Sequence, residues 1–497
     1  MIPIHTQSLG PITDAVTGEY WTPEDLQQKV AERASALLNK HGIGPGSRVV
    51  ILHSNSPAFF ADLFAIWTAG ACAACADPSM GVADYESLIS TVRPDLIITQ
   101  GGLPAKLATF RSTVTSVESA NVVSGDAATF RTPLPDDPAL ILFTSGSTGL
   151  PKGVVHTFRT LASKWKMLER FVPLEVCETT LCALPTHFGH GLICNSLYPL
   201  VNGKHLVIMP KPDVQLATRL GPIIDQHAVT FMSSVPAIWR MALRLSKRPT
   251  EKSLQQVHIG SAPLSADLWR AVAEWTGTSR VWNTYGITEV GSWVAGPVDN
   301  SSPQPRDGFV GRGWGSEILV APDGADPASP SGFQAVPEGQ TGHVWLRTPD
   351  LMANYLGLPD ETNDVVRGVW FKTGDIGSME KGQLILAGRV RNEINKGGIK
   401  ISPEEIDLTL EQHPAVMEAC TFARPDPMLG EDIGVCIVLG DSEAVGKDEL
   451  AKWVARHLSD AKVPRHWYFV DEIPKTSRGK VNRRAVADFA TTQNASR

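Results

Sequence analysis

Short runs of β-forming residues alternate along this chain with longer segments in which apolar residues have helical spacing. Two such runs are Arg48–Leu52 and Asp95–Thr99, whereas Pro23–Asn39 places apolar side chains three and four positions apart. This alternation is typical of an α/β fold in which helices cover largely parallel sheets. We therefore expect a large N-terminal domain of helix-covered sheets, followed by a small α+β domain at the C-terminal end.

The length and composition are those of a globular enzyme with more than one packed unit. At 497 residues the chain is long for one hydrophobic core. Charged residues make up 20% and hydrophobic residues 42% of the chain, which are ordinary values for a folded protein. The net charge of −7 provides no basic surface for nucleic acid or for an anionic membrane. We expect neither of these among the partners.

The sequence shows no sign of export or of membrane insertion. The N-terminal residues lack the positive and apolar regions of a secretory signal, so we expect a cytoplasmic location. The mostly apolar stretch from Ala58 to Ala76 contains Asp62, Thr68 and Gly70. It is therefore predicted to be a buried helix that runs into a strand, and no membrane span is expected.

A loop rich in hydroxyl groups and glycines, Thr144–Gly153 (TSGSTGLPKG), follows the apolar run Ala139–Phe143. Glycines bring backbone N–H groups close to an anion, and hydroxyl groups and an ammonium add donors, so the loop is suited to a polyphosphate. It is not a Walker A loop, because Pro151 stands where that motif needs glycine and Gly153 where it needs Ser or Thr. A P-loop kinase or ATPase is disfavoured. Taken alone, the loop is equally compatible with a flexible surface turn.

Four further motifs follow in order along the chain. They are Asn283–Glu289 (NTYGITE), Trp370–Asp375 (WFKTGD), Gly388–Arg391 (GRVR) and Pro474–Lys480 (PKTSRGK). With the loop, their order and spacing resemble the adenylate-forming superfamily, which includes acyl- and aryl-CoA synthetases, peptide-synthetase adenylation domains and firefly luciferase. The resemblance extends over about residues 20–486. It implies an enzyme that uses ATP to activate a carboxylic acid as acyl-AMP with release of pyrophosphate.

The resemblance implies a nucleotide site assembled from several segments. Asp375 would accept hydrogen bonds from both ribose hydroxyls, Arg389 would contact the ribose or a phosphate, and Tyr285 would lie against the adenine. The residues expected to bind ATP are Thr144, Ser145, Gly146, Ser147, Thr148, Gly149, Lys152, Gly260, Ser261, Ala262, Asn283, Thr284, Tyr285, Gly286, Asp375 and Arg389.

Three residues are expected to act on the reacting groups. Glu289 resembles the magnesium ligand of the family, with Thr288 beside it reaching a phosphate. Lys480 lies in a basic loop that, read without the resemblance, is a solvated charge run. In the family the matching lysine crosses from the small domain to bridge the carboxylate and the α-phosphate, a role suited to a mobile point charge. Lys480, Thr288 and Glu289 are therefore the expected catalytic residues, and Glu289 is the expected metal ligand.

The chain is predicted to divide near Gly388–Arg391. We expect an adenylation domain at residues 1–388, a hinge at residues 389–391 and a mobile C-terminal domain at residues 392–497. Residues Pro403–Leu410 are predicted to form a helix, with Ser402 as N-cap and Glu405 as the acid of a capping box.

In the family the small domain rotates about the position that Arg391 occupies here, where Asp or Lys is common. Pivoting at Arg391 is expected, although the polar contacts of this hinge are left open. The residues expected to approach the pantetheine arm after the rotation are Lys396, Gly397 and Gly398.

The segment His187–Gly191 (HFGHG) contains no acidic residue, whereas members that activate amino acids usually carry an aspartate there. An α-amino acid substrate is therefore disfavoured, and nearby aromatic residues favour an aryl or medium apolar acid. Phe188 matches the family's gate between the acyl site and the thiol tunnel. His190 and its neighbour His187 are suited to orient a polar substituent, but packed histidines are the simpler interpretation. The residues expected to line the acyl pocket are His187, Phe188, Trp239 and Trp293, with the tryptophans equally suited to a core.

Taken together, the motifs predict an acid–thiol ligase that uses ATP, Mg²⁺ and coenzyme A. The phosphopantetheine of an acyl carrier protein remains an alternative acceptor, because it presents the same arm to the same tunnel. A non-catalytic nucleotide-binding module is disfavoured by the joint presence of Lys152, Glu289, Asp375 and Lys480. Luciferase-like oxidation of the adenylate stays open, since it shares the first half-reaction.

Overall fold

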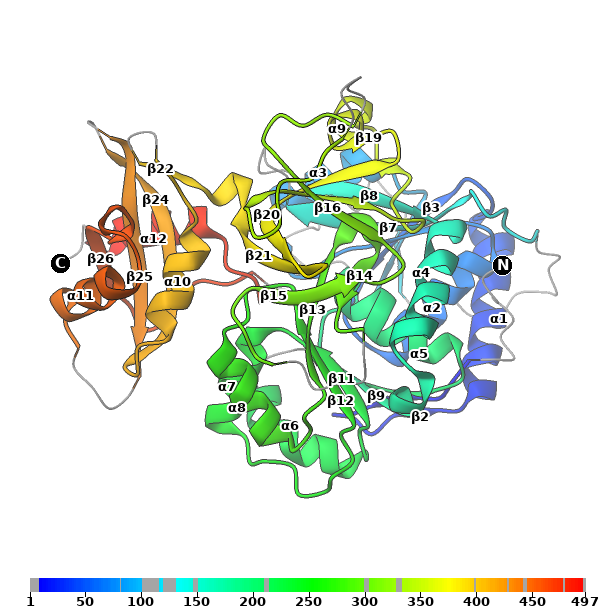
Figure 1. Cartoon of the computed structure of the whole chain (residues 1–497). Coiled ribbons are helices and arrows are strands. Elements are labelled where there is room, and N and C mark those ends of the chain that lie inside the picture. The colour runs from blue at the N-terminus through cyan, green and yellow to red at the C-terminus, as the bar shows by residue number, and fades with distance from the viewer. Residues whose placement is uncertain are drawn as a thin grey trace.

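The computed structural model describes residues 9–80, 82–100, 116–118, 131–145, 151–209, 214–298, 304–327, 333–396, 399–426, 429–440, 445–476 and 479–494. Figure 1 shows a large N-terminal body of sheets and helices, with a smaller lobe beside it that contains the C-terminal end of the chain. The predicted α/β fold, with a large sheet domain and a small C-terminal domain, is confirmed.

One sheet of the large domain combines a parallel half with an antiparallel half. Its order is β16-β17-β20-β21-β15-β14-β13-β12-β11-β9-β10-β1-β2, with β19 beside β20. The neighbours from β13 through β12, β11 and β9 to β10 and β1 run parallel, whereas those from β13 to β16 run antiparallel. The antiparallel half departs from the expectation of largely parallel sheets. The strands are β1 (Ile12–Asp14), β2 (Tyr20–Trp21), β9 (Thr179–Cys182), β10 (His205–Ile208), β11 (Phe231–Ser234), β12 (Gln256–Gly260), β13 (Val281–Ile287), β14 (Ser292–Gly296), β15 (Phe309–Gly313), β16 (Glu317–Ala321), β17 (Gly342–Arg347), β19 (Val366–Arg367), β20 (Trp370–Glu380) and β21 (Gln383–Arg389).

A second sheet contains the strand that precedes the hydroxyl-rich loop. Its order is β18-β8-β7-β4-β3-β5-β6, and β7 and β8 form an antiparallel pair on either side of that loop. The strands are β3 (Arg48–Leu52), β4 (Cys72–Cys75), β5 (Leu96–Thr99), β6 (Ser116–Glu118), β7 (Pro138–Ser145), β8 (Pro151–Thr157) and β18 (Asn354–Tyr355).

The helices of the large domain begin where local sequence signals place them. Helix α1 starts after Thr22, whose hydroxyl accepts from the Asp25 N–H in a reciprocal capping box, and it ends at Gly42 with a φ of 65°. The stretch Ala58–Ala76 forms α2 and β4, as predicted. None of the helices in the described part of the chain has the length and apolar character needed to cross a bilayer. The helices are α1 (Pro23–His41), α2 (Pro57–Thr68), α3 (Val82–Val92), α4 (Phe158–Phe171), α5 (Tyr198–Val201), α6 (Val214–Gln226), α7 (Pro236–Leu245), α8 (Ala266–Thr276) and α9 (Pro359–Val365), with the π-helix η5 (His190–Leu197) and short 3₁₀ turns at η4 (Leu174–Cys177) and η6 (Thr288–Val290).

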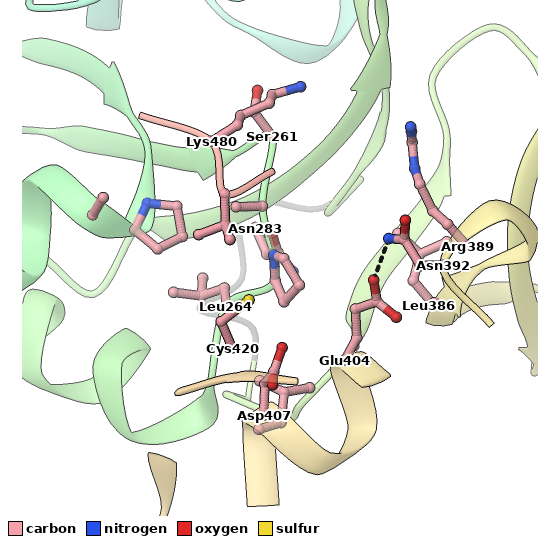
Figure 2. Close-up of a pocket in the computed structure, with 18 of the residues that line it drawn as sticks. Ser261, Leu264, Asn283, Leu386, Arg389, Asn392, Glu404, Asp407, Cys420 and Lys480 are labelled. Carbon is pink, nitrogen blue, oxygen red and sulfur yellow. Dashed lines mark hydrogen bonds between the residues drawn. The ribbon is translucent and has the colours of Figure 1, made fainter. Parts of the chain in front are cut away.

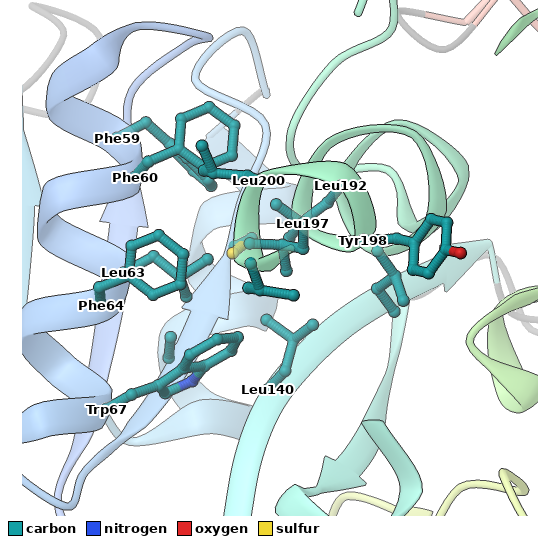
Figure 3. Packing of buried hydrophobic residues seen from close by; sticks show 14 of the residues in the cluster. Phe59, Phe60, Leu63, Phe64, Trp67, Leu140, Leu192, Leu197, Tyr198 and Leu200 are labelled. Atoms are coloured by element: carbon teal, nitrogen blue, oxygen red, sulfur yellow. The ribbon is translucent and has the colours of Figure 1, made fainter. Parts of the chain in front are cut away.

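A continuous apolar core joins α2, β7 and the π-helix η5. Figure 3 shows Phe60 and Phe64 of α2 facing Leu140 of β7, together with Leu192 and Leu197 of η5. All of these side chains are buried. This core fixes η5 against the second sheet and so determines where the HFGHG segment, which runs into η5, enters the large domain.

The small domain is a mixed sheet with helices on it. The strand order is β23-β22-β25-β24, with β26 parallel to β25. Since β21 ends at Arg389 and β22 belongs to this separate sheet, we keep residues 389–391 as the proposed boundary. The elements are β22 (Ile394–Lys396), β23 (Ile399–Ile401), β24 (Val416–Asp426), β25 (Gly430–Leu439), β26 (His466–Phe469), α10 (Pro403–Glu411), α11 (Lys447–His457), α12 (Arg483–Asn494) and the 3₁₀ turns η7 (Val390–Asn392) and η8 (Asp460–Lys462).

The predicted capping box at the start of α10 is wrong. Pro403 does begin the helix, but the side chain of Ser402 makes no capping hydrogen bond. Its hydroxyl instead donates to the Ala387 carbonyl at 2.7 Å, and Glu405 pairs with Lys462. A tertiary contact at the domain junction has replaced the local cap.

Candidate active site

A cavity of about 270 Å³ lies between the two domains. Helix α7, the turn after β12 and the strands β13, β20 and β21 line one side, and α10, β24 and the loop before α12 line the other. Figure 2 shows Lys480 beside Ser261, with Arg389, Asn392 and Glu404 across the cavity. The amide of Asn392 donates to Glu404 Oε1 at 2.6 Å. Residues far apart in the sequence therefore line one cavity.

Three of the predicted nucleotide-binding residues meet on the wall of this cavity. The Tyr285 hydroxyl donates to Asp375 Oδ2 at 2.5 Å, and Arg389 Nε lies 2.6 Å from Oδ1. Burial and the charge of Asp375 raise the pKa of Tyr285 well above its usual range, and the same charge raises the pKa of Arg389. The hydroxyl thus stays protonated and the guanidinium charged. Each carboxylate oxygen has a second lone pair, so Asp375 retains acceptor capacity for ribose hydroxyls.

The turn after β12 brings its backbone close to β13. A Cβ atom on Gly260 would lie 2.5 Å from the Thr284 carbonyl oxygen, so only glycine fits there. Ser261 follows with a φ of 68°, which directs the chain to the cavity. Asn283 donates its amide to the Phe309 carbonyl at 2.8 Å. Of the other predicted nucleotide residues, the structure also places in the lining Ala262, Thr284 and Gly286.

The predicted metal ligand is oriented by a tyrosine that the sequence did not single out. Tyr355 of β18 donates its hydroxyl to Glu289 Oε1 at 2.7 Å, which leaves Oε2 as a hard oxygen ligand of the kind that Mg²⁺ prefers. In the described part of the chain no group of three or more His, Cys, Asp or Glu side chains is arranged to hold a metal. A single carboxylate fits an ion that arrives with ATP phosphates and retains waters. Glu289 would hold such an ion, with Thr288 beside it reaching a phosphate.

The predicted phosphate loop is described at its two ends. Thr144 is paired with Lys152, and Ser145 with Pro151, across β7 and β8. Lys152 forms an ion pair with Glu361 of α9, and its ammonium lies 5.1 Å from the ring centroid of Tyr355. Lys152 therefore shares a cluster with Tyr355 and Glu289. Outside the described residues lie Gly146, Ser147, Thr148 and Gly149.

The predicted catalytic lysine reaches the large domain. Lys480 Nζ lies 5.1 Å from the ring centroid of Phe188. Burial and the nearby ammonium of Lys480 lower the pKa of His190 to about 3, so this imidazole is neutral. His190 Nδ1 lies 2.9 Å from Ser261 Oγ, and Nε2 lies 2.5 Å from Ser233 Oγ. The structure thus brings Lys480 and the HFGHG segment together at one end of the cavity.

Two of the residues expected in the acyl pocket lie in aromatic clusters. Trp239 is fully buried in contact with Trp275, at a centroid separation of 5.8 Å, and we leave it out of the proposed pocket. Trp293 lies 5.5 Å from the His190 ring, directly behind the segment that faces Lys480. His187 Nε2 lies 3.6 Å from Asp77 Oδ2.

Of the residues predicted for the thiol tunnel, Lys396 is described and is not part of the cavity lining. The backbone of Arg391 forms part of η7 between the domains. Lys396 pairs within the small domain with Asp432 at 2.9 Å. Gly397 and Gly398 lie outside the described residues. The assignment of these residues to the thiol tunnel stays a prediction, because it applies to the arrangement after the small domain has rotated.

The two domains are also joined by polar contacts that α10 and the residue after it make with the large domain. Arg240 Nη2 lies 2.5 Å from Glu411 Oε2, and Gln412 donates to Asp307 Oδ2 at 2.8 Å. Burial raises the pKa of Glu411 to about 7 despite the attraction of Arg240. These contacts hold the small domain over the cavity, and no local sequence signal announces them.

Comparison with known proteins shows the family to which the chain belongs. A family model described as AMP-binding enzyme matches residues 10–356, and one described as AMP-binding enzyme C-terminal domain matches residues 405–480. The chain belongs to the adenylate-forming superfamily. This confirms the resemblance predicted from the five motifs.

Several relatives of this adenylate-forming ligase are named as CoA ligases. Oxalate–CoA ligase of Arabidopsis thaliana is 29% identical over 95% of this chain and 94% of that protein. Feruloyl-CoA synthase of an Amycolatopsis species is 28% identical over 96% of each. The solved structure of the anthranilate CoA ligase AuaEII with anthranoyl-AMP has a TM-score of 0.87 at 22% identity, covering 99% of this chain and 96% of that one. The named acids differ, so the family alone does not assign the acid.

Proposed function

We propose that this enzyme condenses a carboxylic acid with ATP to give acyl-AMP and pyrophosphate, and then transfers the acyl group to the thiol of coenzyme A. The observation that carries the proposal is the position of Lys480, which lines the cavity together with Tyr285 and Asp375 and whose ammonium lies 5.1 Å from the ring centroid of Phe188. A cation at the junction of an acyl site and a nucleotide site is what attack of a carboxylate on an α-phosphate requires.

Each side chain has a separate task in this proposal. Asp375 accepts the ribose hydroxyls while Tyr285 and Arg389 keep its carboxylate in place. Lys480 stabilises the charge that develops between the carboxylate and the α-phosphate. Lys152 binds the distal phosphates. Mg²⁺, when bound through Glu289, neutralises phosphate charge.

The proposed acid is an aryl or medium apolar carboxylic acid without an α-ammonium group. The HFGHG segment carries no carboxylate to receive an ammonium. The rings of Phe188, His190 and Trp293 are packed in sequence behind the Lys480 ammonium, with centroid separations of 5.7 and 5.5 Å. Planar aromatic walls favour a planar apolar substrate. The relative named for a feruloyl group supports the same class of acid. The relative named for oxalate makes a short dicarboxylic acid the substrate to compare with it in the test.

Coenzyme A is the proposed acceptor because the relatives that cover nearly the whole chain are named as CoA ligases. A carrier-protein phosphopantetheine presents the same thiol arm and is the alternative outcome of the test.

The test is pyrophosphate release with aryl, medium-chain, short dicarboxylic and α-amino acids, with and without coenzyme A. We expect turnover with an aryl or medium-chain acid that rises when coenzyme A is added, and an acyl-CoA product by mass spectrometry. If coenzyme A has no effect on adenylation, the proposed acceptor becomes the phosphopantetheine of a carrier protein. Absence of release with every acid would favour a non-catalytic nucleotide-binding module.

A further inference from the structure

A buried ion pair lies behind the turn that carries Thr288 and Glu289. Lys164 of α4 and Asp350, which precedes β18, have side chains that are each 1% exposed, and Lys164 Nζ lies 2.5 Å from Asp350 Oδ2. Isolated buried pairs are weak sources of stability, because desolvation offsets the attraction, and apolar replacements are often tolerated. Net stability is therefore a weak reason for this pair, whereas its contacts with neighbouring segments provide a stronger one.

Lys164 connects the two segments that flank the turn. Its ammonium donates to the Trp293 carbonyl at 2.5 Å, so it binds the first residues of β14 as well as Asp350. The chain that starts at Asp350 then returns to the turn, where the Met352 N–H donates to the Glu289 carbonyl at 2.7 Å. Three residues later, Tyr355 orients the Glu289 carboxylate. The Lys164 ammonium thus binds the two segments on either side of Glu289, the start of β14 and the chain that begins at Asp350.

His156 of β8 supports the other side of the turn. It is fully buried, and its Nε2 lies 2.8 Å from the Thr288 carbonyl oxygen. A carbonyl can only accept, so Nε2 carries the proton and the tautomer is fixed. The same carbonyl accepts from the Gly291 N–H at 3.0 Å, which closes the turn.

The turn itself has an unfavourable backbone conformation. Gly291 has a φ of 63° and Ser292 a φ of 81°, so two successive residues occupy the left-handed region. For a residue with a Cβ atom this conformation is costly and persists only where the surroundings enforce it. Gly291 also packs on the Lys164 stem, since a Cβ there would lie 3.4 Å from Lys164 Cε.

We propose that Lys164, Asp350 and His156 are positioning residues that hold the Thr288–Ser292 turn so that Thr288 and Glu289 face the ATP phosphates. The proposal rests on the proposed adenylation reaction. It assigns a function in nucleotide binding to three buried side chains, a cation, a carboxylate and an imidazole.

The first test removes the ion pair without leaving an unpaired charge. In Lys164→Met/Asp350→Leu we expect adenylation to fall about tenfold to a hundredfold and the Mg²⁺ concentration for half-maximal rate to rise, with little change in the KM for the acid. Thioester formation from a supplied acyl-adenylate should be retained. Lys166→Met is the matched control, because Lys166 is exposed on the same helix, and it should behave as wild type.

The second test uses the donor of His156. Gln can donate from Nε2 to the Thr288 carbonyl, whereas Leu cannot, so His156→Gln should retain most of the adenylation rate that His156→Leu loses. Hydrogen exchange of the Thr288–Ser292 amides, measured without substrates, should be faster in the Leu variant and in the double variant than in wild type.

The outcomes separate this inference from the proposed function. Wild-type Mg²⁺ dependence and exchange rates in the double variant and in His156→Leu would overturn the inference. So would a parallel loss of both half-reactions that follows the folded fraction measured by circular dichroism. If wild type itself activates no acid, the proposed function fails, and the exchange rates still decide whether the three residues hold the turn.

Discussion

The ammonium group of Lys480 lies 5.1 Å from the ring centroid of Phe188, although one belongs to the loop before α12 and the other to the segment before η5. A cation over an aromatic face is attracted by the ring quadrupole, most strongly where water is excluded. This contact, with the Arg240–Glu411 pair, keeps the small domain over the cavity. The described arrangement is therefore the one that we propose for the first half-reaction.

Removal of the Lys480 ammonium should abolish the first half-reaction selectively. Since it is the cation at the acyl end of the cavity, we expect Lys480→Ala to lower adenylation by at least about a hundredfold. Conversion of a supplied acyl-adenylate to the thioester should continue, as measured by acyl-CoA formation. An equal loss of both steps in a folded variant would contradict this assignment.

The Phe188 ring should contribute to the position of that ammonium. A cation–π contact is worth about 0.5–2 kcal/mol, so Phe188→Leu should slow adenylation by about twofold to thirtyfold. Phe188→Tyr keeps the ring face and is the matched control, with a rate close to that of wild type. The adenylation rates are compared at saturating concentrations of the acid, so that a changed affinity for the acid does not affect them. Equal rates for Leu and Tyr would show that the ring face is not used.

Tyr355 should affect the metal requirement through Glu289. Tyr355→Phe removes the hydroxyl that donates to Glu289 Oε1. Hydrogen bonds to charged groups contribute about 1.5–3 kcal/mol, so we expect the Mg²⁺ concentration for half-maximal pyrophosphate release to rise about tenfold or more. Tyr20→Phe, at an exposed tyrosine, should leave it unchanged. An unaltered Mg²⁺ profile in Tyr355→Phe would separate Tyr355 from the metal site.

Glu411 should make stability fall as the pH rises toward neutrality. Burial raises its pKa from 4.5 to about 7, so between these values the folded state binds more protons than the unfolded state. The free energy of unfolding therefore decreases with rising pH in this window, and the contribution is present in full only below it. Asp407, whose pKa is raised by burial to about 6, acts in the same direction at lower pH.

Urea unfolding at pH 5, 6, 7 and 8 measures this effect. The difference between wild type and Glu411→Gln should change from pH 5 to pH 7 and level off toward pH 8, because glutamine does not titrate. Glu405→Gln removes a charge from the same helix at a side chain that is 40% exposed, and its difference from wild type should be nearly constant. Parallel curves for wild type and Glu411→Gln would show that Glu411 does not bind a proton in this range.

The sequence predicted those elements for which the signal is local. The apolar spacing over Pro23–Asn39 predicted α1, and the structure adds a capping box of Thr22 and Asp25 that needs no distant contact. Ser402 carries the same kind of signal and fails, since a carbonyl of the domain junction takes its hydroxyl. The antiparallel half of the large sheet was also not predicted, because strand direction depends on partners that lie far along the chain.

The motifs alone predicted the family and the adenylating reaction class, which the family models confirm. They also led to the proposed residues around the nucleotide, because phosphates, ribose and a reacting carboxylate each demand particular donors and acceptors. Only the tertiary structure placed Tyr285 against Asp375, ninety positions away, and only it revealed Tyr355, the Lys164–Asp350 pair and the Arg240–Glu411 contact. Trp239, an equally plausible pocket residue by sequence, is packed against Trp275. The physical reason is that burial and side-chain pairing depend on which distant segments come into contact, and the spacing of residues along the chain does not specify those contacts.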